Sequence, residues 1–345
     1  MVKLRKRGET VRQFILDNVE KSPKDVINAT AKKFNISRQA VYKHIKILIN
    51  QKVLDRDDNG HYKLHPTEQW SETFTINKNT QEDVIWRNEI SVRLGQIPDN
   101  AINIWHYGFT EMFNNVIDHS ESEKATIIID KTAYSTEIYI RDLGIGIFNK
   151  IMRAMNLLDE RHAVLELTKG KLTTDPEHHT GEGIFFTSRM FDTFHIFSGN
   201  VILSHEYGVD EDWILEIKQP HVGTTIAMEL KNNTSRTTKE IFDKFTSEED
   251  YGFNKTIVPV RLAQYGNESL ISRSQAKRLL DRIDRFQIVI FDFTGVETIG
   301  QAFADEIFRV FATQHPSMEI VSIRANQEVL QVIQRAKNYV PPQNQ

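Results

Sequence analysis

Three short polar motifs stand in a fixed order in the middle of the chain, and they constrain its fold more than any other feature. They are Glu111-x-x-x-Asn115, Asp142-x-Gly144-x-Gly146 and Gly181-x-Gly183. The first lies within a helical apolar pattern, the second follows a strand pattern, and the third precedes a helical run. Each motif alone is a weak signal. In this order and at these spacings, they predict one polar site built from a helix, a strand end and a helix start.

The first motif offers the chemistry of a metal and phosphate site. In HYGFTEMFNNVIDHS, residues four apart share a helix face, so Glu111, Asn115 and His119 lie along one side, with Asp118 beside them. An amide oxygen suits a magnesium ion that keeps several waters and bridges phosphates. A carboxylate next to it can orient or deprotonate a water or a hydroxyl group.

The two glycine motifs supply backbone that a ligand can approach closely. Asp142, at a strand end, can accept a hydrogen bond from an adenine amino group, and the glycines that follow leave room for base and sugar. Gly181 and Gly183 precede an apolar helical run, where backbone amides can hold phosphate oxygens. The chain has no Gly-x-x-x-x-Gly-Lys-Ser/Thr, which excludes a P-loop, and Asn149 replaces the third glycine of a dinucleotide fingerprint.

The stretch from about Trp86 to Leu230 resembles the GHKL (histidine-kinase-like, or Bergerat) ATP-binding domain of histidine kinases, anti-sigma serine kinases, gyrase B subunits, heat-shock chaperones and mismatch-repair ATPases. EMFNNVIDH resembles its N box, RDLGIGI its G1 box, TGEGI its G2 box and GTTIAMEL its closing strand. The resemblance implies ATP and magnesium as cofactors, with Glu111 as catalytic base and Asn115 on the metal. The nucleotide-binding residues that it implies are Asn115, Asp118, His119, Asp142, Gly144, Gly146, Thr180, Gly181, Gly183 and Thr224.

The same resemblance places an ATP lid at about residues 148–180. Its basic residues could approach phosphates or simply face solvent; they are Lys150, Arg153, Arg161, Lys169 and Lys171. A sensor kinase would also carry a phosphoacceptor histidine on a helical hairpin before the N box. The only histidine of the preceding segment, His106, lies almost within the N box helix, so we do not expect two-component autophosphorylation.

Residues 1–65, here called the head, are basic, whereas the rest of the chain is acidic. They carry 15 Lys and Arg against 7 Asp and Glu, in a chain whose overall net charge is −4, so we expect the head to meet a polyanion. Apolar spacing predicts three helices, the third capped by Ser37. Asn59-Gly60 then predicts the tight turn of a β-hairpin.

Three helices and a hairpin resemble the winged helix-turn-helix of bacterial transcription regulators, whose third helix would enter the major groove of DNA. A winged helix used only for protein contacts is the alternative. The residues on the third helix that could meet bases and phosphates are Ser37, Arg38, Gln39, Tyr42, Lys43 and Lys46.

The last block alternates strands such as QIVIFDF and MEIVSIRA with helices such as EVLQVIQRAKN, which implies an open α/β layer. It resembles the STAS-like domain of anti-sigma factor antagonists, which implies a protein-interaction module. In phosphorylated members a serine begins the helix after the strand. The stretch 298–302 has no serine, so we do not expect phosphorylation there, and we expect Ser272 and Ser274 to cap a helix.

These blocks predict a multidomain α+β and α/β chain with a winged helix, a GHKL α/β sandwich and a STAS-like α/β layer. The expected boundaries are 1–66 for the winged helix, 67–83 for a linker, 84–232 for the ATP-binding domain, 233–250 for a second linker and 251–340 for the STAS-like domain. The chain has no cysteine and no run of about 18 apolar residues, so we expect no disulfide, no thiolate catalysis and no membrane span. We expect a cytoplasmic location, and a homodimer is compatible with these patterns.

We therefore expect an ATP-binding, ATP-hydrolysing transcription regulator, in which the nucleotide site switches the DNA-binding head and the STAS-like tail. One alternative is an anti-sigma-type protein kinase that phosphorylates a Ser, Thr or His of a partner. Another is a nucleotide-sensing component of a bacterial stress or phage-defence system.

Overall fold

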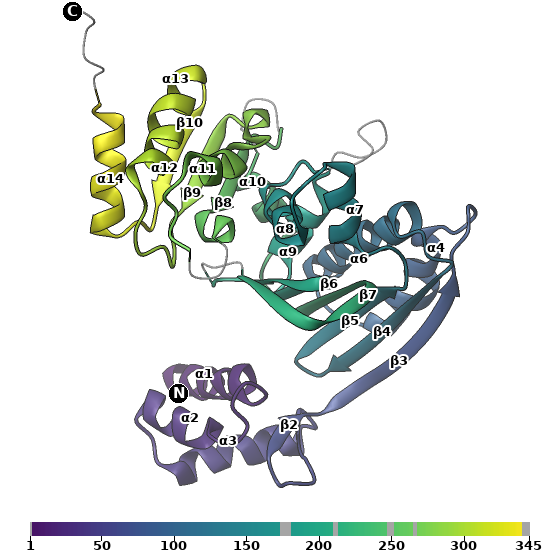
Figure 1. Cartoon of the computed structure of the whole chain (residues 1–345). Coiled ribbons are helices and arrows are strands. Elements are labelled where there is room, and N and C mark those ends of the chain that lie inside the picture. The colour runs from purple at the N-terminus through teal and green to yellow at the C-terminus, as the bar shows by residue number, and fades with distance from the viewer. Residues whose placement is uncertain (1, 173–180, 210–212, 247–251, 265–267, 340–345) are drawn as a thin grey trace, which may run out of the picture.

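The computed structural model describes residues 2–172, 181–209, 213–246, 252–264 and 268–339 (Figure 1). Its architecture is mixed α+β with several sheets: an N-terminal helical unit, a five-stranded antiparallel sheet with helices on one face, and a C-terminal three-stranded parallel sheet. Buried apolar residues form two clusters, one in the N-terminal unit and one that runs from Ile85 to Ala336. The central and C-terminal blocks therefore share one apolar core.

The N-terminal unit is a three-helix bundle with a short hairpin. Ser37 begins the third helix by accepting a backbone hydrogen bond at 3.2 Å, and Asn35, in the left-handed conformation, ends the second. Val41, Ile45 and Leu48 bury one face of the third helix. The elements are α1 (Val2–Asn18), α2 (Val26–Phe34), α3 (Arg38–Asn50), β1 (Leu54–Arg56) and β2 (Tyr62–Leu64).

The central sheet has the strand order β3-β4-β5-β7-β6. Alternation along β5 gives the sheet two different faces: Ile138 and Ile140 are buried toward the helices, whereas Glu137 and Tyr139 lie on the opposite, polar face. The N-terminal unit lies beneath that polar face (Figure 1). The strands are β3 (Pro66–Thr75), β4 (Lys124–Thr132), β5 (Ser135–Asp142), β7 (Trp213–Lys231) and β6 (Thr193–Glu206).

Most of the segment 67–83 is not a linker, contrary to the prediction from sequence. Pro66–Thr75 form the edge strand β3, which pairs with β4 along its length. Only His65 separates β3 from β2, so the hairpin of the N-terminal unit runs directly into the sheet. All ten β3 residues are exposed or half-buried, because an edge strand has a neighbouring strand on one side only. The alternation of Trp70 and Phe74 was therefore too sparse to predict a strand.

The helix α6 is the centre of the helical layer. Its Trp105, Phe109 and Phe113 are fully buried, and the rings of Phe109 and Phe113 stack with centroids 5.5 Å apart. This packing fixes which face of α6 remains for a site. The helices of the layer are α4 (Glu82–Ile85), η1 (Trp86–Ile90), α5 (Ser91–Leu94), α6 (Asp99–His119), α7 (Ile147–Ala154), α8 (Glu160–Lys169), α9 (Gly183–Met190) and α10 (Thr238–Asp243).

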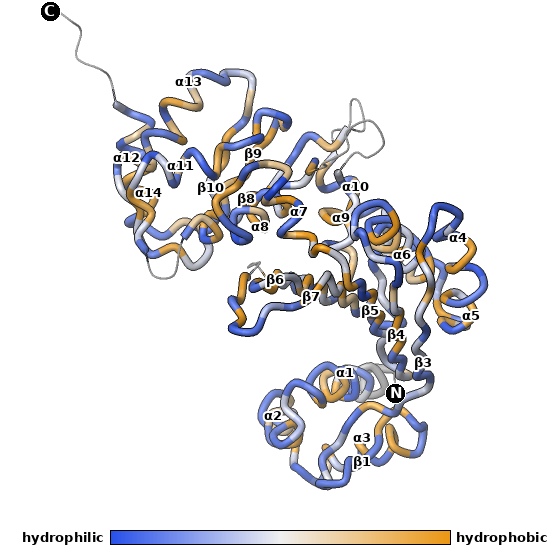
Figure 2. Tube along the Cα trace, turned by 45° about the vertical axis from the view of Figure 1, so that its right-hand side comes forward, coloured by the Kyte–Doolittle hydropathy of each residue, from blue (hydrophilic) through white to orange (hydrophobic). Residues whose placement is uncertain are grey.

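The N-terminal unit contacts the sheet through polar side chains of α1 and the residues that follow it. Asp17 accepts hydrogen bonds from the Tyr134 hydroxyl group and from Lys231 Nζ, and Lys21 pairs with Glu206 at 2.7 Å. Helix α3 lies on the far side of the unit from the sheet (Figures 1 and 2). The exposed face of α3 is therefore directed away from the rest of the chain.

The C-terminal block has parallel strands in the order β10-β9-β8. Val289 and Phe291 of β9 are fully buried, as expected for the central strand of a covered sheet. Among the described residues, no helix combines the length and the apolar character that a membrane span requires. The elements are β8 (Lys255–Pro259), η2 (Val260–Ala263), α11 (Arg273–Leu280), η3 (Ile283–Arg285), β9 (Ile288–Asp292), α12 (Gln301–Asp305), η4 (Glu306–Phe311), α13 (Ala312–Gln314), β10 (Glu319–Ile323) and α14 (Gln327–Lys337).

Candidate nucleotide site

A pocket of about 290 Å³ lies between the sheet and helices α6, α7, α8 and α9. It gathers residues from all three polar motifs and from the closing strand β7. Eight residues predicted from the sequence line it: Glu111, Asn115, His119, Asp142, Gly146, Gly181, Gly183 and Thr224. The fold thus brings segments more than one hundred residues apart in sequence to one cavity.

Two of the other predicted residues lie outside the lining, and one cannot be placed. Asp118 is exposed in the last turn of α6 and is not among the lining residues, so its role as a ligand-binding residue stays a prediction. Gly144 lies behind the lining, where its amide donates a hydrogen bond to Asp142. Thr180 falls outside the described residues.

Asp142 is the most buried polar residue of the site, with 2% of its surface exposed. Its Oδ1 accepts hydrogen bonds from the amides of Gly144 at 2.8 Å and Thr224 at 3.2 Å. Burial raises the pKa of the carboxyl group, and these hydrogen bonds oppose that rise. The Thr224 hydroxyl group in turn accepts from the Ile147 amide at 3.0 Å. The two amide donors hold the Asp142 carboxyl group at the pocket wall, where it can act as an acceptor.

Two glycines of the motifs make room for a close neighbour. A Cβ at Gly144 would lie 1.8 Å from the carbonyl oxygen of Ser120, at the end of α6. A Cβ at Gly183 would lie 2.0 Å from Oε2 of Glu111. The first contact packs a strand end against a helix end, and the second places the Glu111 carboxylate directly against the start of α9.

Several pocket residues were not singled out from the sequence. Asn114 and Ser120 line the pocket from α6 and its end, and most of the remaining wall is apolar. That apolar wall consists of Met112, Val116, Ile147, Ile151, Leu167, Leu172, Ile184 and Ile226. Apolar residues at helical spacing carry no signal that separates a pocket wall from an ordinary core. The pocket therefore combines an apolar wall with polar groups at the motif positions, as small-molecule sites commonly do.

The basic residues of the expected lid have different environments. Lys150 lines the pocket, and its Nζ donates to the His119 carbonyl oxygen at 2.8 Å. Arg153 is exposed, and Arg161 bonds to Glu216 at 2.6 Å and to the carbonyl oxygen of Gln264 at 2.7 Å. Lys169 and Lys171 also contact the C-terminal block: Lys169 is fully buried there, and Lys171 Nζ lies 4.9 Å from the centre of the Phe286 ring.

The six predicted DNA-contacting residues share one exposed surface of α3 and its N-terminus. Ser37, Arg38, Gln39, Tyr42, Lys43 and Lys46 are all exposed. The apolar Ile47 lies on the same helix with 41% of its surface exposed. The structure therefore leaves this surface open, with mixed basic, polar and aromatic character.

In the C-terminal block, the turn at 298–302 is packed closely. The Gly300 amide donates to the Leu270 carbonyl oxygen at 2.8 Å, and a Cβ at Gly300 would lie 2.7 Å from the Cα of Ile271. Ser272 caps α11 with a complete capping box, as expected, and its Oγ lies 2.9 Å from that of Ser274.

Comparison with known proteins places only the C-terminal part of the chain. Residues 275–329 match a family described as the STAS-like domain of unknown function (DUF4325). The matched segment begins within α11 and ends within α14, so a STAS-like domain is present in this block. No curated protein matches the chain.

Proposed function

We propose that this chain is an ATP-binding regulator, in which a GHKL-type pocket controls a DNA-binding head and a STAS-like tail. The observation that carries the proposal is the pocket lining: residues expected from three separated motifs and a closing strand line one cavity of about 290 Å³. A chance arrangement of polar residues on a helix would not recruit Asp142, Gly181 and Thr224 from other elements to the same wall.

The lining supports a division of roles. Asp142 would accept a hydrogen bond from the adenine amino group, and the apolar wall would hold the base. The start of α9 would meet phosphate oxygens with its backbone amides. Asn115 and Glu111 present hard oxygen donors on one face of α6, which fits a magnesium ion bridging phosphates. Lys150 adds a cation beside that face.

Glu111 would act on the attacking group. A carboxylate that lines the pocket can orient or deprotonate a water, which gives hydrolysis, or a hydroxyl group of a partner, which gives protein phosphorylation. Incubation with γ-labelled ATP separates these outcomes: released phosphate supports the ATPase, and label on a protein supports the kinase. Binding with neither product supports a nucleotide sensor, the role expected in a stress or phage-defence system.

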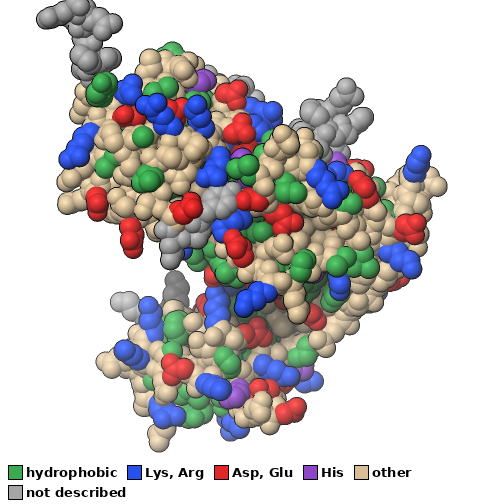
Figure 3. All heavy atoms as spheres, viewed as in Figure 1, with side chains coloured by type: hydrophobic (Ala, Val, Ile, Leu, Met, Phe, Trp, Pro, Cys, Tyr) green, Lys and Arg blue, Asp and Glu red, His purple; other side chains and the backbone are tan. Residues whose placement is uncertain are grey.

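The head supports the DNA-binding part of the proposal. Its predicted contact residues are exposed on α3 and at its N-terminus, and α3 lies on the side of the head away from the sheet (Figure 1). Lys and Arg side chains are spread over the face of the head that Figure 3 shows. The STAS-like tail supplies a protein-interaction type of fold, which suits a module that receives or relays a signal.

The nucleotide assignment is tested by Asn115→Ala in titration calorimetry with Mg-ATP. We expect the affinity for Mg-ATP to fall by at least about tenfold, or roughly 1.4 kcal/mol, and the dependence of binding on magnesium to disappear. Asn103→Ala is the matched control, because Asn103 is the same residue type on the same helix but is exposed and outside the lining. Unchanged binding by Asn115→Ala would overturn the assignment of the first motif.

A further inference from the structure

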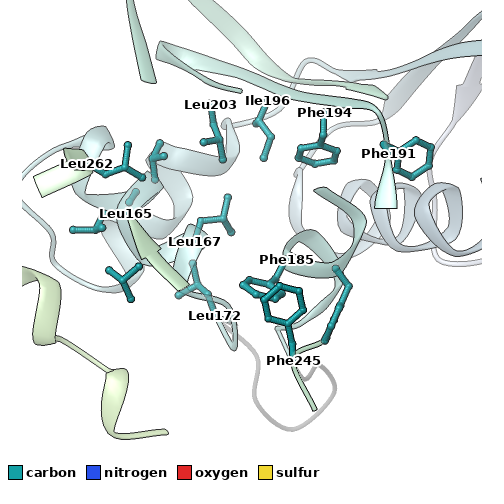
Figure 4. Close-up of a cluster of buried hydrophobic side chains, with 14 of the residues drawn as sticks. Leu165, Leu167, Leu172, Phe185, Phe191, Phe194, Ile196, Leu203, Phe245 and Leu262 are labelled. Atoms are coloured by element: carbon teal, nitrogen blue, oxygen red, sulfur yellow. The ribbon is translucent and has the colours of Figure 1, made fainter. Parts of the chain in front are cut away.

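The pocket wall that α8 supplies is covered from behind by the C-terminal block. Leu167 of α8 lines the pocket. The same helix packs against β8 and η2, and Leu165, Leu167 and Leu262 of η2 belong to one buried cluster (Figure 4). This part of the expected lid is therefore not a free flap, because one of its sides is part of the shared core.

Lys169, at the end of α8, is the polar centre of this contact. It is 1% exposed, and its ammonium group donates to Glu166 Oε1 and, at 2.9 Å each, to the carbonyl oxygens of Arg278 and Asp281. These acceptors use the full donor capacity of a lysine. Glu166 is also fully buried and pairs with Arg282 at 3.2 Å. The C-terminal block thus completes the buried Lys169–Glu166 pair of α8 with two carbonyl oxygens and the Arg282 guanidinium.

The cluster also includes potential metal ligands. His162, Glu166 and Asp281 hold possible ligand atoms within 4.8 Å of one another. However, the Glu166 carboxylate already binds the Lys169 ammonium and the Arg282 guanidinium. We therefore assign the cluster to an ion-pair joint between the two blocks rather than to a cation site.

The joint continues along the chain to the third motif. The carbonyl oxygen of Lys171 accepts hydrogen bonds from Arg282 at 2.7 Å and from Arg285 at 3.1 Å. The next amide, that of Leu172, donates to the Gly181 carbonyl oxygen at 3.1 Å. Leu172 and Gly181 both line the pocket. The peptide group between Lys171 and Leu172 thus connects η3 of the C-terminal block to the glycine motif, with one hydrogen bond on each side.

We propose that the STAS-like block sets the position of the pocket wall at residues 167–172, with Lys169 as the positioning residue. Nucleotide binding and the state of the C-terminal block would then be coupled. This proposal rests on the proposed function of the pocket. Coupling between two binding sites is reciprocal, so a partner bound to the C-terminal block would change nucleotide affinity, and a nucleotide would change the affinity for that partner.

The test uses Thr256→Val in the full chain. Thr256, in β8, is fully buried outside the pocket lining, and its Oγ1 donates to the Lys169 carbonyl oxygen at 2.6 Å. The replacement keeps the shape and removes this one bond. We expect the Kd for Mg-ATP to rise by about two- to fivefold. The control is Lys277→Met, on α11 with its side chain 69% exposed, which should leave the Kd unchanged.

Hydrogen exchange distinguishes a local change in the pocket wall from a general loss of stability, because it reports on each segment separately. Without nucleotide, Thr256→Val should exchange faster at residues 160–172 but not at 124–142 in the sheet. In the wild type, Mg-ATP should slow exchange at residues 273–285, which line no part of the pocket, and Thr256→Val should reduce this effect. Lys169→Met should show the same pattern more strongly where it folds.

The outcomes separate the coupling from the proposed function. The coupling is overturned, and the proposed function stands, if the wild type binds Mg-ATP, Thr256→Val binds it with the same affinity, and Mg-ATP slows exchange only at the pocket. A wild type that binds no nucleotide overturns the proposed function and the regulatory role with it. In that case, exchange at residues 160–172 without nucleotide still reports whether the joint holds the wall.

Discussion

Replacement of Gly183 by alanine should separate the stability of the site from its chemistry. The new Cβ would lie 2.0 Å from Oε2 and 2.9 Å from Cδ of Glu111, and both atoms belong to the far end of a flexible side chain. Gly183 is the first residue of α9. Alanine favours a helix over glycine by about 1 kcal/mol. Displacing Glu111 from its rotamer costs about 0.5–1.5 kcal/mol. These effects nearly cancel, so the free energy of unfolding should change by less than about 1 kcal/mol.

The activity should respond much more strongly than the stability. Under the proposed function Glu111 is the general base of ATP turnover. Because such a base typically contributes about 10²–10⁴-fold to a rate, displacing Glu111 should lower that turnover by at least about tenfold. The assay is phosphate release or transfer at saturating Mg-ATP, with thermal unfolding measured on the same sample.

Gly144→Ala is the comparison variant. Its Cβ would lie 1.8 Å from the backbone carbonyl oxygen of Ser120, which cannot rotate away. We expect a loss of roughly 1–3 kcal/mol or more from such overpacking. A Gly183→Ala variant that unfolds as readily as Gly144→Ala, or that folds and keeps full turnover, would refute the placement of Glu111 against the start of α9.

Two further predictions concern the head and the polar face of the sheet. Replacing Arg38 and Lys43 with alanine should weaken binding to duplex DNA and reduce the slope of log K against log salt by about 0.9 for each phosphate that the head no longer neutralises. Anisotropy titrations across salt concentrations measure this, and a wild type that binds no DNA at low salt would make the head a protein-interaction module. Glu137 lies directly opposite Glu229 on the neighbouring strand, and burial followed by nearby carboxylates raises its pKa. Because the pKa of Glu137 in the folded state lies above its unfolded value, the folded state is more stable when Glu137 is protonated. This stability is present at low pH and is lost as pH rises through the raised pKa. Glu137→Gln should therefore stabilise the protein at pH 7 by roughly 0.2–1 kcal/mol and have little effect near pH 4, and an equal gain in melting temperature at both pH values would contradict the reasoning.

Local signals in the sequence located most elements. Ser37 begins a helix because its hydroxyl accepts a backbone hydrogen bond, and Gly60 closes the hairpin turn with φ +79°. The four-residue spacing placed Glu111 and Asn115 on one face of α6, and both line the pocket. The STAS-like character of the C-terminal block is confirmed by the family match.

Features that depend on distant partners could not be read in this way. The strand β3 is defined by pairing with β4, whose partner residues lie 49 to 66 positions further along the chain, and its own apolar pattern is weak. Lys169 looks like any solvated lysine in sequence, yet two of its three acceptors come from residues 278 and 281. Asp118 follows the helical pattern of its neighbours, but its side chain is exposed and is not in the pocket lining.

The direct passage from β2 into β3 has a practical consequence for dividing the chain. A fragment that begins after residue 75 would remove the edge strand along with the head, and it would expose the backbone groups of β4 over the length that β3 now covers. Unpaired strand edges are templates for intermolecular pairing. The head should therefore be excised at His65, before β3 begins, so that the remaining fragment keeps the edge strand with which its sheet was folded.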